Sequence, residues 1–239
     1  MAVCLRSLGN AGVELSGANR VIRVDAYFAH IARVGGAPVL NPDRDPPPDL
    51  LLVTHGHPDH FLPSAVALAY ARAAAAGRPF TVAGPRAALA ALAGKLPPER
   101  LVTLEPREKS SPPDAAVYED AASGARVTAF RTFHGPGGHN SYLIEFSGVR
   151  VFHDGDSERQ QSYDAPRLAP LDALCSCPWQ GSGWEAFLER LAPKRWLLIH
   201  MTPEELSDHA RGAFLPPLMT RPGQPPAAVG LWPGETVNL

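Results

Sequence analysis

The sequence predicts an α/β fold built in layers, and three observations lead to this prediction. Short apolar runs with strand-like composition are grouped early and late in the chain, with breaker-free helical stretches between and after them. Several of these runs end in histidine or aspartate, as expected where strands lead into loops that form a site. No internal repeat and no coiled-coil heptad interrupts the pattern. We therefore expect one layered domain with its polar side chains gathered on one edge of a sheet.

The first half of the chain begins with strands broken by turns, because Gly/Asn-rich turn signals separate its short apolar stretches. The expected elements then follow in this order: a strand over 20–25, a Pro/Asp-rich loop over 41–49, a buried strand over 50–54, a helix over 64–75, a strand over 80–83 and a helix over 85–96. The stretch 64–75 is rich in alanine, which favours a helix. Pro85 suits the first turn of the next helix, because a backbone N–H at that position would have no hydrogen-bond partner within the helix.

The second half alternates apolar runs with turns and then closes with helices. Strands are expected within 117–145 and over 149–152, 171–177 and 195–200, helices over 184–191 and from Thr202 onward, and a last strand near 234–239. Thr202 and Glu205 have the spacing of a capping box, which marks the start of a helix.

Composition bounds the size of the protein and the partners it attracts. The chain has 239 residues, of which 45% are hydrophobic, and this is enough for one large domain spanning 1–239. Its formal net charge of −2 indicates no bulk attraction to nucleic acid or to an anionic membrane surface. We expect a small-molecule substrate, no nucleic-acid partner and no membrane association, and the sequence leaves a homo-oligomer open.

The three cysteines favour a reducing compartment. Cys4, Cys175 and Cys177 form an odd set without a repeating framework, which argues against a disulfide scaffold. The N-terminus lacks the charged segment and apolar stretch of a secretory signal. No apolar run approaches the roughly 20 residues that a membrane-spanning helix needs. We therefore expect a cytoplasmic protein.

The most informative motif is the run His-Gly-His-Pro-Asp-His at positions 55–60. It follows the apolar run 50–54, so three imidazoles and one carboxylate lie on a tight loop at a strand end. Pro58 would interrupt a helix, which favours the loop. On such a loop the first two histidines can point one way and Asp59 and His60 another, an arrangement that suits two adjacent metal ions.

Together with residues further along the chain, this run resembles the five ordered motifs of the metallo-β-lactamase superfamily of binuclear metallohydrolases. The matching positions, in chain order, are Asp25, then His55, His57, Asp59 and His60 in an HxHxDH pattern, then His134, Asp156 and His200. The resemblance covers nearly the whole chain and implies a four-layer αβ/βα sandwich. The opening Leu8-Gly9-Asn10-Ala11-Gly12 is similar to the branch that contains ascorbate-6-phosphate lactonases, although Asn10 and Ser157 stand where that branch often has histidine and threonine.

The resemblance also implies how these residues act. One metal site would comprise His55, His57 and His134, a second would comprise Asp59, His60 and His200, Asp156 would bridge them, and Asp25 would support the metal-binding loops. The expected cofactors are two divalent ions, zinc before manganese or iron. Two ions about 3.5–4 Å apart share a hydroxide that forms near pH 7 and attacks a carbonyl or phosphoryl centre. Asp59 would orient the water or pass a proton to the leaving group.

Two of the assigned ligands have rivals nearby. His139 competes with His134 for the third motif, and the position at a strand end favours His134. Asp154 lies two residues before Asp156, and strand alternation would put both on one face, so both remain candidates, with Asp156 preferred.

Three residues are candidates for contacting the substrate. His139 is a candidate proton donor or substrate contact, and its neighbour Asn140 is a second substrate contact. Trp179 follows a strand end and would line the pocket, although tryptophan is more often simply packed.

The sequence thus predicts a binuclear metal-dependent hydrolase that cleaves a lactone, an amide or a phosphoester. An iron-dependent oxidoreductase of the same fold, similar to sulfur dioxygenases, is the alternative. A non-catalytic metal-binding protein would be expected to have lost ligands, and none of the motif positions is missing here.

Overall fold

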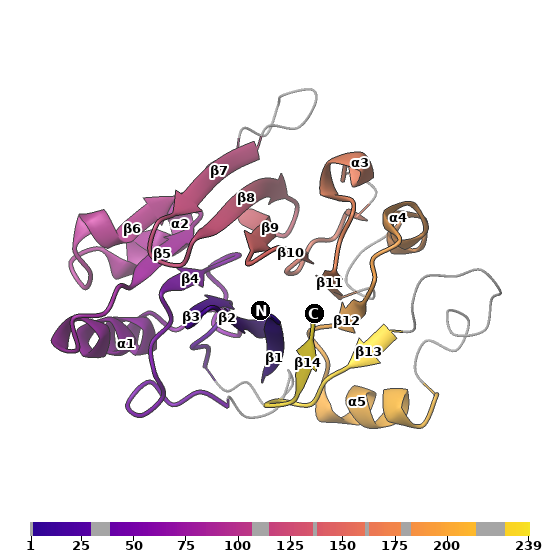
Figure 1. Ribbon diagram of the computed structural model, residues 1–239, viewed down its shortest axis with the longest axis horizontal. Helices are drawn as coiled ribbons and strands as arrows, with labels where there is room; N and C mark the ends of the chain where they lie inside the picture. The colour runs from indigo at the N-terminus through magenta and orange to yellow at the C-terminus, as the bar shows by residue number, and fades with distance from the viewer. Residues whose placement is uncertain are drawn as a thin grey trace.

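Two mixed β-sheets form the centre of the molecule, with helices on both outer faces (Figure 1). The computed structural model describes residues 2–29, 39–106, 115–135, 138–160, 163–177, 183–213 and 228–239. Within these residues each sheet contains seven strands. The predicted αβ/βα sandwich is therefore confirmed.

The first sheet has the strand order β14-β1-β2-β3-β4-β5-β6. Its strands are β1 (Cys4–Gly9), β2 (Gly12–Gly17), β3 (Arg20–Val24), β4 (Leu50–Leu52), β5 (Thr81–Gly84), β6 (Leu101–Thr103) and β14 (Thr236–Asn238). Strands β14 to β3 are antiparallel neighbours, and β3 to β6 are parallel. Its outer face carries α1 (Pro63–Ala75) and α2 (Arg86–Leu89), the latter continued by the short turn η1 (Ala90–Leu92); a second turn, η2 (Pro98–Arg100), precedes β6.

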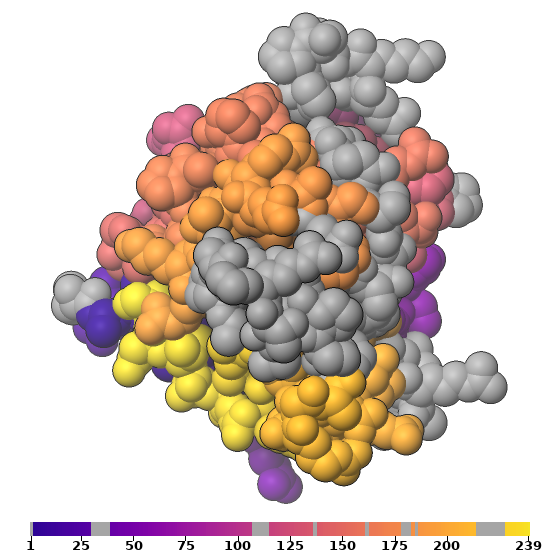
Figure 2. Space-filling view, turned by 90° about the vertical axis from the view of Figure 1, so that its right-hand side faces the viewer, coloured from indigo at the N-terminus to yellow at the C-terminus, as the bar shows by residue number. Residues whose placement is uncertain are grey.

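The second sheet has the strand order β13-β12-β11-β10-β9-β8-β7. Its strands are β7 (Ala115–Asp120), β8 (Ala125–Thr132), β9 (His139–Phe146), β10 (Val149–His153), β11 (Ala173–Ser176), β12 (Trp196–Leu198) and β13 (Ala228–Gly230). Strands β7 to β10 are antiparallel neighbours, and β10 to β13 are parallel. The helices on its outer face are α3 (Ala165–Leu168), α4 (Trp184–Leu191) and α5 (Pro203–Ala210). Figure 2 shows the side of the molecule where the salmon, orange and amber atoms of α3, α4 and α5 lie.

Three hydrophobic clusters hold the layers together, and the alternation of strand residues explains them. Leu50 and Leu52 of β4 point into the cluster between the two sheets, whereas Leu51 points outward into the cluster beneath α1 and α2. All three leucines are fully buried, which explains why this strand is a continuous apolar run. On α1, Val66, Ala69 and Ala73 share the buried face, at helical spacing.

Most of the expected elements lie where the sequence places them, and one helix is wrong. The stretch 64–75 is helical, and Thr202 and Glu205 form the predicted capping box at the start of α5. The helix expected over 85–96 ends early, because the backbone turns extended at Ala93, and Gly94 adopts a left-handed φ of 72°. A glycine at this point ends the helix that the alanine-rich stretch would otherwise continue.

The candidate site residues follow the C-terminal ends of strands in both sheets. Asp25 and the run 55–60 follow β3 and β4 of the first sheet, whereas His134, Asp156 and His200 follow β8, β10 and β12 of the second. The expectation of a site on one sheet edge is therefore wrong: the facing edges of two stacked sheets supply the loops.

Among the described helices, none is long and apolar enough to cross a membrane.

Candidate metal centre

Seven metal-competent side chains lie in two adjacent groups. The first group is His55, His57 and His134; the second is Asp59, His60, Asp156 and His200. Within each group, one potential ligand atom from every residue lies within 4.8 Å of the others. These groups contain all seven residues expected to bind metal, divided as the resemblance implied, with Asp156 placed in the second group.

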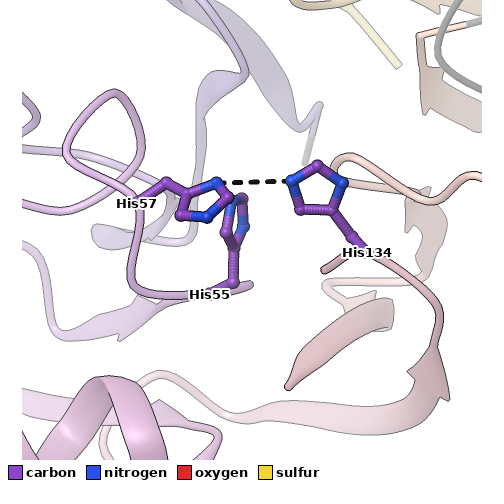
Figure 3. Close-up of side chains that lie close together, drawn as sticks. All are labelled: His55, His57 and His134. Carbon is purple, nitrogen blue, oxygen red and sulfur yellow. Dashed lines mark hydrogen bonds between the residues drawn. The ribbon is translucent and has the colours of Figure 1, made fainter. Parts of the chain in front are cut away.

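The first group brings together two loops that are distant in the sequence (Figure 3). Nε2 of His134 lies 3.3 Å from Nδ1 of His57, and the ring of His55 lies 4.4 Å from that of His57 and 4.8 Å from that of His134. His57 is exposed, His134 is half-buried and His55 is buried. The group therefore opens to solvent on one side.

Asp156 occupies the centre of the whole arrangement. Its Oδ2 lies 3.2 Å from Nε2 of His60 and 3.5 Å from Nε2 of His200, both in the second group. The same oxygen lies 3.7 Å from Nε2 of His134 in the first group. Asp59 completes the second group, with Oδ2 3.2 Å from Nε2 of His200. One carboxylate oxygen thus connects the two groups.

Asp25 and Thr54 hold the loop of residues 55–60 in place through hydrogen bonds. Asp25 Oδ1 accepts a hydrogen bond from the Thr54 backbone N–H at 2.8 Å, and Oδ2 accepts one from the Thr54 hydroxyl at 2.7 Å. Asp25 Oδ2 also lies 2.8 Å from Nδ1 of His60, and the Thr54 hydroxyl lies 3.0 Å from Nδ1 of His55. Because both rings are held at Nδ1, their Nε2 atoms face the candidate site.

Asn10 supports the second group from the first strand turn. Its side-chain N–H donates to the Asp59 backbone carbonyl at 2.7 Å, and its backbone carbonyl accepts from the His200 backbone N–H at 2.9 Å. His200 has a left-handed φ of 61°, so its backbone depends on such support. The sequence identified Asn10 only as a departure from a family branch. Its supporting contact becomes visible only in the fold.

Glu158 contacts His134 and was not anticipated from the sequence. Its Oε1 lies 3.0 Å from Nδ1 of His134, so the carboxylate orients the ring with Nε2 toward His57. The sequence shows only that Glu158 lies two residues after Asp156, and its contact with His134, 24 residues away in the chain, becomes visible in the fold.

We expect Glu158→Gln to weaken zinc binding about tenfold, because losing the carboxylate behind a metal-bound histidine reduces both its orientation and its basicity. Isothermal titration of the metal-stripped protein with zinc measures this effect. Glu119→Gln is the matched control, since Glu119 is a highly exposed carboxylate on β7. Equal affinities for the two variants would contradict the positioning role of Glu158.

His139 is buried and engaged on both sides of its ring, which does not favour the expected contact with substrate. Its side chain is 0% exposed, its Nδ1 lies 2.5 Å from the Thr132 hydroxyl, and its Nε2 accepts from the Asp156 backbone N–H at 3.0 Å. Burial, followed by the charge of His55, lowers the pKa of His139 well below its usual value. A neutral ring with its proton on Nδ1 fits both hydrogen bonds. The geometry supports a positioning role for His139.

Asn140 and Asp154 belong to neither group of ligands. Asn140 is fully buried and donates to the Leu104 carbonyl at 2.8 Å. Asp154 accepts hydrogen bonds from Tyr163 and from Gln160, and burial raises its pKa to about 7. Trp179 lies outside the described residues.

The charge balance of the second group centres on His60 and Asp156. Burial lowers the pKa of His60, but the carboxylates of Asp156 and Asp25 outweigh burial, and its pKa lies well above the usual value. Burial raises the pKa of Asp156, but His60 and other neighbouring histidines hold it well below its usual range. In the metal-free chain, the positively charged ring of His60 thus lies among carboxylates, where a divalent cation would replace that charge.

In the first group, burial and then the charge of His60 lower the pKa of His55 to about 2, so its ring is neutral and able to bind metal.

Comparisons with known proteins place this geometry in a family. The model of the Beta-lactamase superfamily domain matches residues 20–208. A search of curated proteins finds no match. Among solved structures, a metallo hydrolase from the hyperthermophilic archaeon Ignicoccus hospitalis aligns with a TM-score of 0.65 and 15% identity, covering 100% of this chain and 99% of that chain.

Two further structures have related folds. The diiron beta-hydroxylase CmlA from Streptomyces venezuelae aligns with a TM-score of 0.66 and 16% identity, over 99% of this chain and 54% of that one. An isothiocyanate hydrolase from Delia radicum gut bacteria aligns with a TM-score of 0.62 and 14% identity, over 98% of both chains. At these identities the similarity shows a shared fold. Because the family match covers well over half of the sequence, this chain belongs to the β-lactamase superfamily.

Proposed function

We propose that this protein is a metal-dependent hydrolase with two divalent ions, one in each group of ligands. The observation that carries the proposal is the position of Asp156, whose Oδ2 lies 3.2–3.7 Å from imidazole nitrogens of both groups. A carboxylate shared in this way suits two neighbouring cations, because its negative charge offsets their mutual repulsion.

The buried polar atoms of the site fit bound metal. Nε2 of His55 and Oδ1 of Asp156 are buried and have no hydrogen-bond partner among the described residues, and the buried Nε2 of His60, although 3.2 Å from Asp156 Oδ2, forms no well-aligned hydrogen bond. An unpaired buried polar atom is costly, so three of them converging on one place indicate a missing partner. Metal ions would satisfy all three atoms at once.

The kinds of side chain in the two groups narrow the choice of ion. The two groups comprise five imidazoles and two carboxylates, with no thiolate. Such a set suits zinc and is also compatible with manganese or iron. We propose zinc as the ion, held by His55, His57 and His134 in one site and by Asp59, His60 and His200 in the other, with Asp156 between them.

The protein's own groups would position the substrate's reacting centre and handle its proton. Bound divalent ions supply Lewis acidity and lower the pKa of a bound water toward 7. Asp59 is only half-buried, and its Oδ2 faces His200, so this carboxylate could accept a proton from the attacking water at Oδ2 and pass it to the leaving group. His139 would act indirectly, by fixing the backbone of Asp156.

The proposed substrate is a small polar molecule with a lactone, amide or phosphoester bond, and the proposed location is the cytoplasm. The first group of ligands is partly exposed, so a small substrate can reach it. The net charge of −2 indicates no attraction to nucleic acid or to an anionic membrane, which also favours a small-molecule substrate. Hydrolase activity in two of the structural neighbours, both of which match along almost their whole length, supports the reaction class.

An iron-dependent oxidoreductase is the second candidate. The carboxylate-rich second group also suits iron, and the neighbour from Streptomyces venezuelae is a diiron hydroxylase. That protein is much longer than the part matched here, so the hydrolase remains our first proposal.

Metal analysis tests the proposal directly. Protein purified without added metal or chelator should contain about two zinc or manganese ions per chain, as a two-metal hydrolase requires, measured by inductively coupled plasma mass spectrometry. A panel of lactones, amides and phosphoesters then identifies the reaction. Iron content with no hydrolysis would favour the oxidoreductase, and protein that neither contains nor takes up metal would contradict both proposals.

A further inference from the structure

A hollow beside the candidate metal centre carries positive charge that the proposed reaction does not use. It is lined by Arg86 and Ala87 of α2, Ala90, Glu105 and Arg131. Among the described residues that line the hollow, two guanidinium groups outnumber one carboxylate. The chain as a whole is slightly negative, so this local charge does not simply follow its composition.

Arg131, which lines the hollow, and Ala88 of the adjoining helix α2 contact the two loops that supply the first group of ligands. Gly56, between His55 and His57, lies against α2: a Cβ at this position would be 3.8 Å from the Ala88 Cα. Gly138 lies against Arg131, and a Cβ there would be 2.8 Å from its guanidinium nitrogens. A molecule held by the arginines would therefore be next to the loops that hold the proposed metal ions.

Glu105 contacts both arginines of the hollow. Its Oε1 accepts a hydrogen bond from the Arg86 backbone N–H at 2.6 Å, and its Oε2 lies 3.5 Å from Nη1 of Arg131. The side chain of Arg86 is exposed, and among the described residues no group forms a hydrogen bond or ion pair with its guanidinium. Arg86 is thus available to a ligand, while Glu105 holds Arg131 in place.

We propose that this hollow binds an anionic group of the substrate, a carboxylate or a phosphate, at a point away from the bond that is cleaved. The proposal rests on the proposed hydrolase function and adds the substrate class: an ester, lactone or amide that carries a negative charge. Arginine suits this role, because its planar set of donors matches the oxygens of carboxylate and phosphate groups. Ala87 and Ala90 leave room for such a group between the two side chains.

Binding to metal-stripped protein tests the hollow independently of catalysis. Inorganic phosphate and acetate are titrated into the full-length chain, and the backbone amides of Ala87 and Ala90 are followed by NMR. We expect saturable shifts in the wild-type protein, and dissociation constants about tenfold higher for Arg86→Gln, as the loss of a charge-assisted hydrogen bond implies. The probe that binds more tightly identifies the anion.

Arg190→Gln is the matched control, because Arg190 is an exposed arginine on α4, which packs on the other sheet (Figure 1). This variant changes the net charge equally and should bind both anions like the wild-type protein. Equal weakening in both arginine variants, or no shift in the wild-type protein, would overturn the proposal.

A second measurement connects the hollow to turnover. With metal restored, the ratio of kcat/KM for an ester bearing a carboxylate to that for its neutral isostere should fall about tenfold in Arg86→Gln. An unchanged ratio would contradict the substrate class. If the wild-type protein hydrolyses neither ester, the proposed function fails on these substrates, while the anion titration still decides whether the hollow binds anions.

Discussion

Asp156→Asn is expected to remove most of the activity and at least one bound metal ion. The substitution keeps the shape of the side chain but removes the charge of the oxygen that lies within 3.7 Å of Nε2 of His60, His200 and His134. We expect kcat/KM to fall by roughly 10³-fold or more, the scale of loss when one preorganised electrostatic group is removed from a reaction centre. Metal analysis and steady-state kinetics on a substrate found by screening measure the two effects.

Asp154→Asn is the control for this experiment, because it makes the same chemical change two residues away. Asp154 faces Tyr163 and Gln160 and belongs to neither group of ligands. The Asp154 variant should keep its metal, and circular dichroism should show that both variants fold. An Asp156→Asn protein with two ions and wild-type turnover would show that Asp156 does not connect the two sites.

Gly155→Ala is expected to destabilise the fold by about 2–5 kcal/mol, as the sum of left-handed backbone strain and overpacking. Gly155 has a φ of 62°, and a Cβ at this position would be 2.5 Å from Nε2 of His139. The backbone that leads to Asp156 would have to move, so metal affinity should fall as well. Urea unfolding and zinc titration measure the two quantities.

Gly77→Ala separates the two contributions to the loss of stability, namely the clash of the new Cβ with His139 and the strain of a left-handed backbone. Gly77 has the same φ of 62°, but nothing lies within 4 Å of the place its Cβ would occupy, so we expect a cost of only about 1–2 kcal/mol. Adding His139→Ala to Gly155→Ala should restore part of the stability, because the two sites are in contact. An equal decrease in the free energy of unfolding for Gly77→Ala and Gly155→Ala would show that Gly155 does not pack tightly against His139.

The ligands were predictable because their signal is local. Each one follows a short apolar run, and strands that end in histidine or aspartate place those side chains in loops. The run 55–60 identifies the site without reference to the rest of the chain.

Apart from the support by Asp25, which the family resemblance implied, the supporting contacts were not predictable, because they join residues that only the fold brings together. Asn10 reaches Asp59 from another strand turn, and Glu158 reaches His134 from another loop. His139 shows the same limit, since no local pattern indicates that Gly155 packs against its ring. The arrangement of two facing sheets, which decides all of these contacts, follows from long-range strand pairing rather than from local pattern.

The pairing of β14 with β1 has a consequence for how the protein is made. Residues 236–238 complete the first sheet at its N-terminal strand, so a growing chain exposes one side of β1 until these residues leave the ribosome. Such an open strand invites pairing with other chains during synthesis. Arg6 lies within β1 with its side chain 36% exposed, and its charge would discourage that association until the native partner arrives.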